Sequence, residues 1–318
     1  MLEKLISKSA HYFFIIFVAM VVGILYNKVQ DKYERENKQS DTNLIQQFLL
    51  GDTQFYNKKP ILWIHLDYPI NSRDWATFYE RNSRMLNKPF VYLCIQSIIR
   101  HSERYNVCII DDSSFGHLIE WDVDLEQVPE PVKKSVRTEG ILRLLYKYGG
   151  AIVPASLLMW RPVEWMRDDF VVFKRTRSVV SETMVYMPSV DFMGANRGSP
   201  VIKKCLDYVV GLNRRDLTHE KVFLDEVSKW LLVAVNSGEL TGIRENMVGF
   251  KNKNNEHVLI DDLIKMDGVH YPENTCCIWI PEEELISRLS YQWFVRMSPS
   301  QILQSNTSIA QYFIIALQ

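Results

Sequence analysis

The chain has 318 residues, of which 47% are hydrophobic, and this is enough for one large globular domain with shorter appended segments. Lysine and arginine number 37 against 38 aspartate and glutamate, so the formal net charge is only -1. This lack of a basic excess argues against nucleic acid as a partner. The five cysteines have no metal-ligand spacing, and Cys94 and Cys108 lie in apolar runs, which predicts buried free thiols.

Residues 10–26 form an apolar run interrupted only by His11, and we expect a single membrane-spanning helix there. A helix of this length covers about 25 Å, and flanking Tyr and Lys side chains can bridge the rest of a hydrocarbon core of roughly 30 Å. A cleaved signal peptide is the alternative, but Leu25, Tyr26 and Asn27 do not form a small-residue cleavage site. Residues 1–26 are therefore predicted to be a single-pass membrane anchor.

Lysine and arginine are more frequent after the apolar run than before it, which favours a cytoplasmic main domain and leaves the orientation otherwise open. Residues 27–59 are rich in charged and amide side chains, and they predict a polar stalk with a short helix near residues 44–49. Residues 60–318 are then predicted to form the globular domain.

The globular part opens with two predicted strands separated by a helix. Residues 60–66 form a short apolar run that suits a buried strand, and residues 105–110 form a second such run. Between them, residues 90–101 carry apolar side chains at helical spacing. Strands that alternate with amphipathic helices predict an α/β domain.

Two carboxylates, Asp111 and Asp112, directly follow the second of these strands. In open α/β sheets ligands gather outside the carboxyl ends of the strands, so both residues are candidates for a ribose contact or for a displaced metal site. The alternative, which we favour, is that Asp112 or Ser113 caps the next helical turn.

A longer helix is predicted over residues 130–148, where Pro131 suits the first turn and apolar residues recur at spacings of three and four. Gly149 and Gly150 follow the last periodic residue, where a left-handed backbone conformation can end a helix. Ala151, Ile152 and Val153 then form a short apolar strand that Pro154 ends.

Further elements follow in the second half of the chain. We expect strands at residues 170–173, 192–195 and 276–280, helices from Pro200 through Val209 and at residues 220–235, and an apolar tail at residues 291–318 that packs on the domain or on a partner. His257, Asp261 and Asp262 could be assembled into a metal site, but a solvated helix start is the interpretation we favour there.

The stretch from Glu130 to Ser156 resembles the core of the capsular-polysaccharide-synthesis and mannosyltransferase-like glycosyltransferases, which have the GT-A fold. Their pattern is S-D-x-x-R, then L-Y-x-Y-G-G, then an apolar strand that closes on D-x-D. Arg143 stands where the family has its arginine, and residues 145–150 reproduce the middle part. The resemblance implies an α/β domain with a mostly parallel sheet flanked by helices, and it makes Arg143 a candidate contact to a nucleotide sugar.

Both acidic parts of that family pattern are lost. Glu139 and Gly140 stand where the family has Ser-Asp, and Pro154 and Ser156 stand where it has the two residues of D-x-D. In the family, D-x-D carboxylates hold a divalent cation against the diphosphate of a nucleotide sugar, and the cation stabilises charge on the leaving group. No Asp or Glu occurs between Glu139 and Glu164 that could replace them. The resemblance therefore implies a GT-A scaffold without its metal and without another cofactor.

Residues 60–66 also resemble the P-K-I-I-H-Q-I-W opening of the same glycosyltransferases, where the strand ends beside the nucleotide. This makes Trp63 and His65 candidate contacts to a nucleotide sugar. The alternative, that both are packed core residues, stays open and is the one we favour.

Residues 60–115 further resemble proteins of large double-stranded DNA viruses that have the same glycosyltransferase-like core. The shared motifs are N-S-R-x-W, R-N-S and L-N-x-P within residues 71–89, and I-I-D-D-S-S-F at residues 109–115. Several of these proteins also end the central strand in V-P-A-S, as residues 153–156 do. This likeness implies a viral membrane-associated protein.

Two hypotheses follow from these observations. The first is a membrane-anchored, catalytically silent glycosyltransferase-like domain that serves as a binding or structural module, with virion or capsid proteins as partners. The second is an active glycosyltransferase that transfers a sugar from a nucleotide sugar to a glycan or protein, with Asp111, Asp112 or Glu139 as unorthodox ligands and Mn or Mg as cofactor. The loss of D-x-D favours the first.

Overall fold

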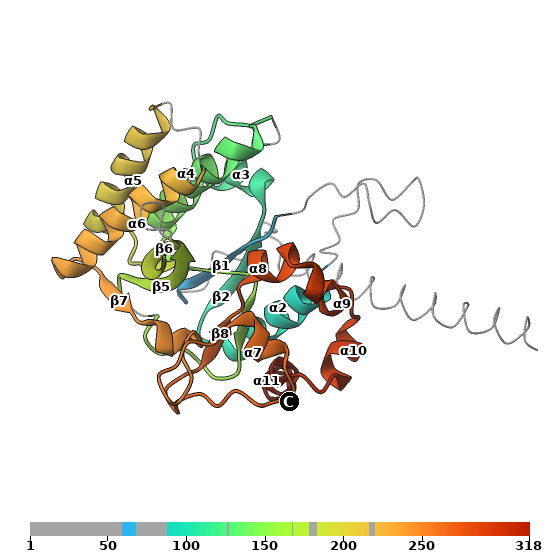
Figure 1. The fold of residues 1–318 in the computed structure, drawn as a ribbon. Coiled ribbons are helices and arrows are strands. Elements are labelled where there is room, and N and C mark those ends of the chain that lie inside the picture. The colour runs from blue at the N-terminus through green and yellow to red at the C-terminus, as the bar shows by residue number, and fades with distance from the viewer. Residues whose placement is uncertain (1–58, 68–87, 126, 167, 178–182, 216–219) are drawn as a thin grey trace, which may run out of the picture. The chain divides into compact units, whose positions relative to one another are not determined.

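The computed structural model describes residues 59–67, 88–125, 127–166, 168–177, 183–215 and 220–318, and all of them fall within one compact unit. Within these residues a six-stranded sheet has the order β2-β1-β3-β6-β5-β7 (Figure 1). In that order the strands are β2 (Asn106–Ile110), β1 (Ile61–His65), β3 (Gly150–Val153), β6 (Met184–Ala195), β5 (Phe170–Arg177) and β7 (Thr241–Ile243).

Strand β6 runs antiparallel to its neighbours β3 and β5, whereas the remaining neighbours in this sheet pair in parallel. The predicted α/β domain with a mostly parallel sheet is therefore confirmed. Strands β5 and β6 are both longer than expected, because their polar outer halves continue the pairing as far as Arg177 and Met184. A second, two-stranded sheet pairs β4 (Leu157–Met159) with β8 (Cys277–Trp279), and β4 was not predicted.

The long helices begin and end close to the predicted residues: α2 (Pro89–His101), α4 (Glu130–Tyr148), α5 (Pro200–Asn213) and α6 (Glu220–Asn236). Helix α2 connects β1 to β2, and α4 connects β2 to β3 in the opposite direction along the sheet. Right-handed connections in opposite directions place α2 and α4 on opposite faces of the sheet. Trp63 and Ile152 face the side of α4, α5 and α6, where they join one large buried cluster. The predicted thiols Cys94 and Cys108 are buried and are not in a disulfide.

Shorter helical segments make up much of the remainder: η3 (Asp112–Ser114), α3 (Phe115–Leu118), η4 (Glu245–Val248), α7 (Ile260–Ile264), α8 (Glu282–Ser287), η5 (Leu289–Tyr291), α9 (Gln292–Val295), α10 (Pro299–Gln304) and α11 (Ser308–Leu317). The apolar tail packs on the domain itself, with α10 and α11 against α2 (Figure 1). Phe294 of the tail meets Phe90 of α2 with ring centroids 6.3 Å apart.

The double glycine is required by the close approach of β3 to β1. Gly149 ends α4 with φ of 70° and Gly150 begins β3 with φ of 95°, both in the region that favours glycine. A Cβ atom on Gly150 would lie 2.1 Å from the carbonyl oxygen of Ile61, so no other residue fits there. The indole of Trp63 donates a 3.0 Å hydrogen bond to the Gly149 carbonyl and fixes the same junction.

The predicted anchor and residues 27–58 of the predicted stalk lie outside the described residues. Among the residues that the structure does describe, no helix is both long enough and apolar enough to cross a bilayer.

Candidate functional site

The carboxyl ends of β1 and β2 meet the first half of helix α4, and polar side chains from all three elements converge there. Side chains alternate along a strand, so His65 lies on the same face of β1 as the buried Trp63 and points toward α4. Its ring stacks on that of Phe115, with centroids 5.8 Å apart. Asp112 comes shortly after the end of β2. Because β1 and β2 pair in parallel, with His65 opposite Ile110, His65 and Asp112 lie at the same edge of the sheet.

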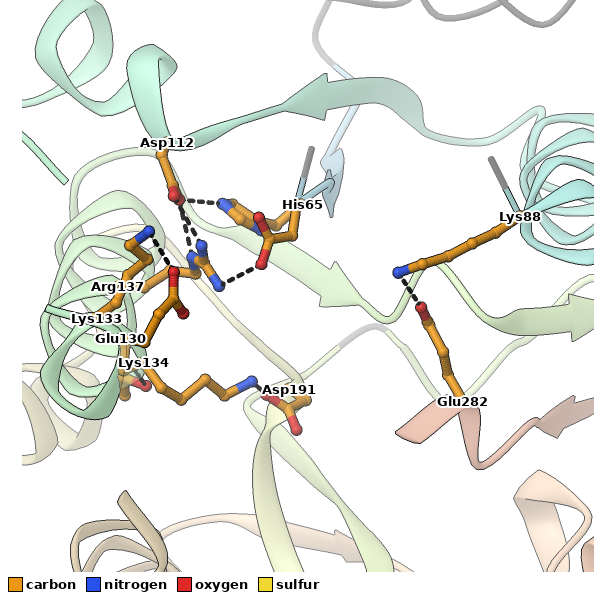
Figure 2. A network of polar contacts seen from close by, with 11 residues as sticks. His65, Lys88, Asp112, Glu130, Lys133, Lys134, Arg137, Asp191 and Glu282 are labelled. Atoms are coloured by element: carbon orange, nitrogen blue, oxygen red, sulfur yellow. Dashed lines mark hydrogen bonds and ion pairs between the residues drawn. The ribbon is translucent and has the colours of Figure 1, made fainter. Parts of the chain in front are cut away.

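Asp112 is the centre of this group, as Figure 2 shows. Its Oδ1 lies 2.8 Å from His65 Nε2 and accepts a 2.8 Å hydrogen bond from Arg137 Nε, while its Oδ2 accepts one of 2.7 Å from another guanidinium nitrogen of Arg137. Arg137 also donates a 3.3 Å hydrogen bond to Asp67. The bidentate pairing of Arg137 and Asp112 is the strong form of this interaction, and it joins α4 to the end of β2.

These contacts determine the charge states in the group. Burial alone would raise the pKa of the Asp112 carboxyl, but hydrogen bonds from His65 and Arg137 together with the Arg137 charge hold that pKa well below its usual range. Burial lowers the pKa of His65 despite the opposing hydrogen bond to Asp112. We therefore assign a neutral imidazole at pH 7, whose Nε2 proton is donated to an ionised carboxylate.

Asp111 caps the helical turn that follows it, and its side chain is engaged in that turn. Its side chain accepts hydrogen bonds from the Ser114 backbone N–H at 3.0 Å and from the Ser113 and Ser114 hydroxyls at 2.6 and 2.8 Å. The prediction that Asp112 or Ser113 caps this turn was therefore wrong in the residue, although the cap itself exists. The capping residue is the one that keeps an extended backbone, and the turn begins one position earlier than expected.

A second polar group forms around Asp191, which lies in an irregular part of β6. The β5 partner changes from Val171, opposite Met193, to Val172, opposite Ser189, so the intervening residues of β6 form a bulge. Bulges redirect side chains, and here the Asp191 carboxylate meets Lys134 of α4 at 2.8 Å and Lys174 of β5 at 3.4 Å (Figure 2).

The position of Asp191 is informative because Met193 pairs with Ile152 of β3. Asp191 is two residues further along β6 in the direction in which β3 ends, so it lies beside the strand end where the family has D-x-D. Burial would raise the pKa of the Asp191 carboxyl, but the two ammonium groups hold it far below its usual range. A carboxylate does occur near this strand end, and two lysines already neutralise it.

The two positions that correspond to D-x-D have structural contacts. Ser156 is 3% exposed and its hydroxyl donates a 2.9 Å hydrogen bond to the carbonyl of Ile280. The Ile280 backbone N–H returns a 3.2 Å hydrogen bond to the Ser156 carbonyl, so Ser156 and Ile280 continue the pairing of β4 with β8 by one residue. Pro154 accepts a hydrogen bond from the Leu157 N–H within the connecting turn.

Gly140, which stands at the position of a family Asp, is closely packed. A Cβ atom there would lie 3.1 Å from two carbon atoms of the Phe115 ring, and Phe115 is fully buried. The ring therefore occupies the space that a carboxylate at position 140 would need.

The remaining sequence candidates lie apart from this group or inside the core. Trp63 is fully buried and its N–H is bonded to Gly149, so it offers a ligand no exposed surface. Arg143 pairs with Glu139 at 2.7 Å, and Glu139 also accepts a 2.8 Å hydrogen bond from Asn213 of α5. These contacts join α4 to α5 and leave neither charge unpaired.

A hollow of about 340 Å³ opens beside Asp112 and is lined by residues 112–125 of η3, α3 and the loop that follows. Its charged lining residues are Asp112, Asp122 and Asp124, and its aromatic wall is Trp121. Three carboxylates repel a diphosphate unless a metal lies between them. Across the described part of the chain, no three His, Cys, Asp or Glu side chains come together in a way that could hold a metal ion.

Of the residues singled out from the sequence, His65 and Asp112 belong to the first polar group, whereas Arg137, Lys134, Lys174 and Asp191 were not singled out. Arg137 could have been found by helical spacing, because it lies on the same stripe of α4 as Gly140 and Leu144, three and seven residues away. Asp191 carries no sequence signal, since a single acidic residue inside a strand is usually solvated.

Comparison with known proteins adds little to this geometry. No protein-family model matches the chain, and no curated protein matches it at a significant level. Among solved structures the chain is similar to the PaToxG glycosyltransferase, with a TM-score of 0.34 and 14% sequence identity over 65% of this chain and 82% of that one. A likeness at this distance assigns neither an activity nor a substrate.

Proposed function

We propose that the chain is a glycosyltransferase-like domain without catalytic activity, which acts as a binding or structural module. The proposal rests mainly on the identity and contacts of the residues that follow β3. Pro154 and Ser156 replace the acidic pair expected from the family resemblance. Ser156 is buried, and it makes two hydrogen bonds with Ile280. The carboxylate beside the end of β3, Asp191, is already paired with Lys134 and Lys174, so a divalent cation finds no unpaired anionic ligand there among the described residues.

The neighbouring charges support the same conclusion. A diphosphate leaving group needs unpaired cations when no metal is present. Here Arg137 is bonded to Asp112 and Asp67, and Lys134 and Lys174 both face Asp191. Each of these cations is thus already in contact with a carboxylate of the chain, with Asp191 shared by the two lysines, and a diphosphate would have to compete with these carboxylates.

The alternative of an active transferase with unorthodox ligands receives no specific support from these contacts. Asp111 caps a turn, Asp112 is bonded to Arg137 and His65, and Glu139 pairs with Arg143 and Asn213. Coordinating a cation would cost each of these carboxylates its present partners.

The membrane anchor at residues 10–26 is part of the proposal, as is a role beside other proteins of a virion or a membrane. Both rest on the sequence: the first on an apolar run of suitable length and the second on the motif resemblance of residues 60–115.

Thermal unfolding of the purified chain against nucleoside diphosphates and nucleotide sugars, with and without manganese, tests the proposal. A ligand that binds only the folded state at 100 times its Kd adds about 2.7 kcal/mol of stability, which is visible as a rise in Tm. We expect no rise with any of them on a cooperatively folding sample. A manganese-dependent rise with one nucleotide sugar, together with release of its diphosphate, would show an active enzyme.

A further inference from the structure

A larger hollow, of about 650 Å³, lies in the C-terminal part of the chain and shares no residue with the polar groups described above. Its lining comes from residues 252–254 and 256–258, from Asp262 of α7, from Lys265 and from residues 267–271. Figure 1 shows α7 beside α11 in this region. We call this hollow the α7 groove.

One wall of the α7 groove is a tight turn fixed by its own hydrogen bonds. The Asn252 side chain accepts from the backbone N–H groups of Asn254 and Glu256 at 2.9 and 3.0 Å, and it donates to the Glu256 carboxylate at 2.8 Å. Lys251 and His257 form a β-bridge at the base of the turn. The wall therefore has one conformation that its own contacts specify.

The other wall is held by helix α11. The Ser308 hydroxyl donates to the carbonyls of Lys265 and Asp267 at 2.9 and 2.7 Å, and the Tyr312 hydroxyl donates to the Val269 carbonyl at 2.6 Å. A 2.7 Å hydrogen bond from the Lys253 N–H to the His270 carbonyl joins the two walls. A groove that is already formed before a ligand arrives loses little conformational entropy on binding.

Most side chains that line the groove are polar, and Lys253, Asn254, Asp267 and His270 among them are exposed to solvent. Among the described residues, no hydrogen bond or ion pair engages the side chains of Lys253, Asn254, Asp267 or His270, although their backbones are held. Tyr271 also lines the groove, and its buried hydroxyl lacks a hydrogen-bond partner within the described residues. The four exposed side chains are solvated, and a ligand that itself donates and accepts hydrogen bonds can take the place of that water.

The chemistry of the lining excludes several classes of ligand. Two lysines are offset by three carboxylates, so the groove has no positive excess for a phosphate or a nucleic acid. Its apolar side chains are two valines, so a lipid or an apolar peptide segment would find few contacts. Amide, imidazole, carboxylate and ammonium groups in near balance provide donors and acceptors without a dominant charge.

We propose that the α7 groove binds a neutral carbohydrate chain, whose hydroxyl groups both donate and accept hydrogen bonds. The proposal is independent of the state of the strand end after β3, since a glycan could bind in the groove whether or not a sugar is transferred elsewhere. The ligand could be a free polysaccharide or the glycan of a glycoprotein, because both present the same chemistry.

The test is a panel of immobilised neutral oligosaccharides, built from glucose, mannose, galactose or N-acetylglucosamine, probed with the full chain in detergent. At least one neutral oligosaccharide is expected to bind, and His270→Ala and Asn254→Ala should each weaken that binding by about tenfold, which is the effect of losing one or two hydrogen bonds. Both side chains are exposed and make no hydrogen bond or ion pair within the described residues, so the variants should fold normally.

His117→Ala and Asn236→Ala are the matched controls, because both residues are exposed and lie outside the groove. They should leave oligosaccharide binding unchanged. Soluble maltodextrin and a glycoprotein displayed in parallel distinguish the two sources of the ligand. The proposal fails if no neutral oligosaccharide binds, if only sulfated glycans bind and lose affinity with salt, or if the groove variants bind as well as the controls.

Discussion

Lys134 on α4 and Asp191 in the bulge of β6 form a 2.8 Å ion pair beside the end of β3. Lys174 approaches the other carboxylate oxygen from β5 at 3.4 Å, and all three side chains are between 22% and 28% exposed. The pairing holds α4 against the sheet at the strand end that has lost its acidic motif. A charge that could otherwise have served a ligand is used to hold the fold together.

Removing this carboxylate should destabilise the chain. In Asp191→Asn two partly buried ammonium groups lose their counter-ion, and we expect unfolding to require about 1–3 kcal/mol less, which allows for their partial exposure. A double-mutant cycle with Lys134→Met, followed by urea unfolding, isolates the coupling between the two residues.

The exposed pair Lys203 and Asp207, 2.6 Å apart on α5, is the control for this cycle. Exposed pairs couple by less than about 0.5 kcal/mol on a helix, so this cycle should give a clearly smaller value. Equal coupling energies in the two cycles would mean that the pair of Lys134 and Asp191 stabilises the fold no more than an exposed surface pair does.

Acid should destabilise the folded chain in part through Asp112. The pKa of Asp112 is held below the ordinary value of about 3.9, so its contribution to the free energy of unfolding is complete above roughly pH 5. That contribution is lost as the pH falls further, because the carboxyl binds a proton at a higher pH in the unfolded chain than in the folded chain. In Asp112→Asn the unfolding free energy should be lower at pH 7 and should fall less steeply between about pH 5 and 3. Urea midpoints measured across that range check this, and an unchanged slope would contradict the assigned ionisation.

His65 should contribute a separate and higher pH window. Burial lowers its pKa below the ordinary value of about 6.5, so the folded state resists protonation and stability decreases as the pH falls below that value. His65→Gln keeps a donor for Asp112 but cannot titrate, and it should flatten the stability curve between about pH 6.5 and 5. A curve that keeps its slope in this variant would show that another group titrates there.

Gly140 packs closely against Phe115, so a side chain at this position requires the ring to shift. Replacing a helical Gly by Ala usually adds about 0.5–1 kcal/mol of stability, but here the new methyl group would press on a buried ring. We expect Gly140→Ala to be neutral or to cost up to about 2 kcal/mol, and Gly140→Asp to cost more. Gly211→Ala in α5, where no atom lies within 4 Å of the added Cβ, should show the ordinary gain.

The anchor prediction is tested by fractionation. A chain that lacks residues 1–26 should leave the membrane pellet and appear in the supernatant, because its long apolar run has been removed. Expression of both forms, with a salt wash of the membranes, provides the comparison. Pelleting of the shortened chain after the wash would locate the membrane contact elsewhere.

Hydrophobic periodicity was sufficient to predict the α/β architecture. The helix over Glu130–Tyr148, the glycines that end it and the strand that follows each came from local signals, and the structure has them within one or two residues of the expected bounds. The outer half of β6 was missed because Pro188 and polar residues interrupt its apolar pattern, while pairing with β5 supplies the missing stabilisation. That pairing is a tertiary effect that no local window contains.

The site was harder to predict because its partners are distant in sequence. Asp112 stood out because it follows a predicted strand, and His65 because its strand resembles the opening of the glycosyltransferases. Their common partner Arg137 is separated from Asp112 by 25 residues. The motif resemblance drew attention to Arg143 instead, which pairs within its own helix. The placement of the Asp191 side chain depends on a bulge in β6. The position of that bulge is defined only by the pairing of β6 with β3 and β5.

Manganese titration of the full chain, followed by the loss of the free-ion electron paramagnetic resonance signal, tests the central claim most directly. The claim is that the strand end after β3 has no metal site, since Ser156 is bonded to Ile280 and Asp191 is neutralised by Lys134 and Lys174. The account predicts that the free signal is the same with the chain as without it, both in buffer and in the presence of a nucleoside diphosphate, which itself chelates manganese. Stoichiometric loss of that signal, abolished in Asp191→Asn, would contradict it and place a functional metal at the strand end.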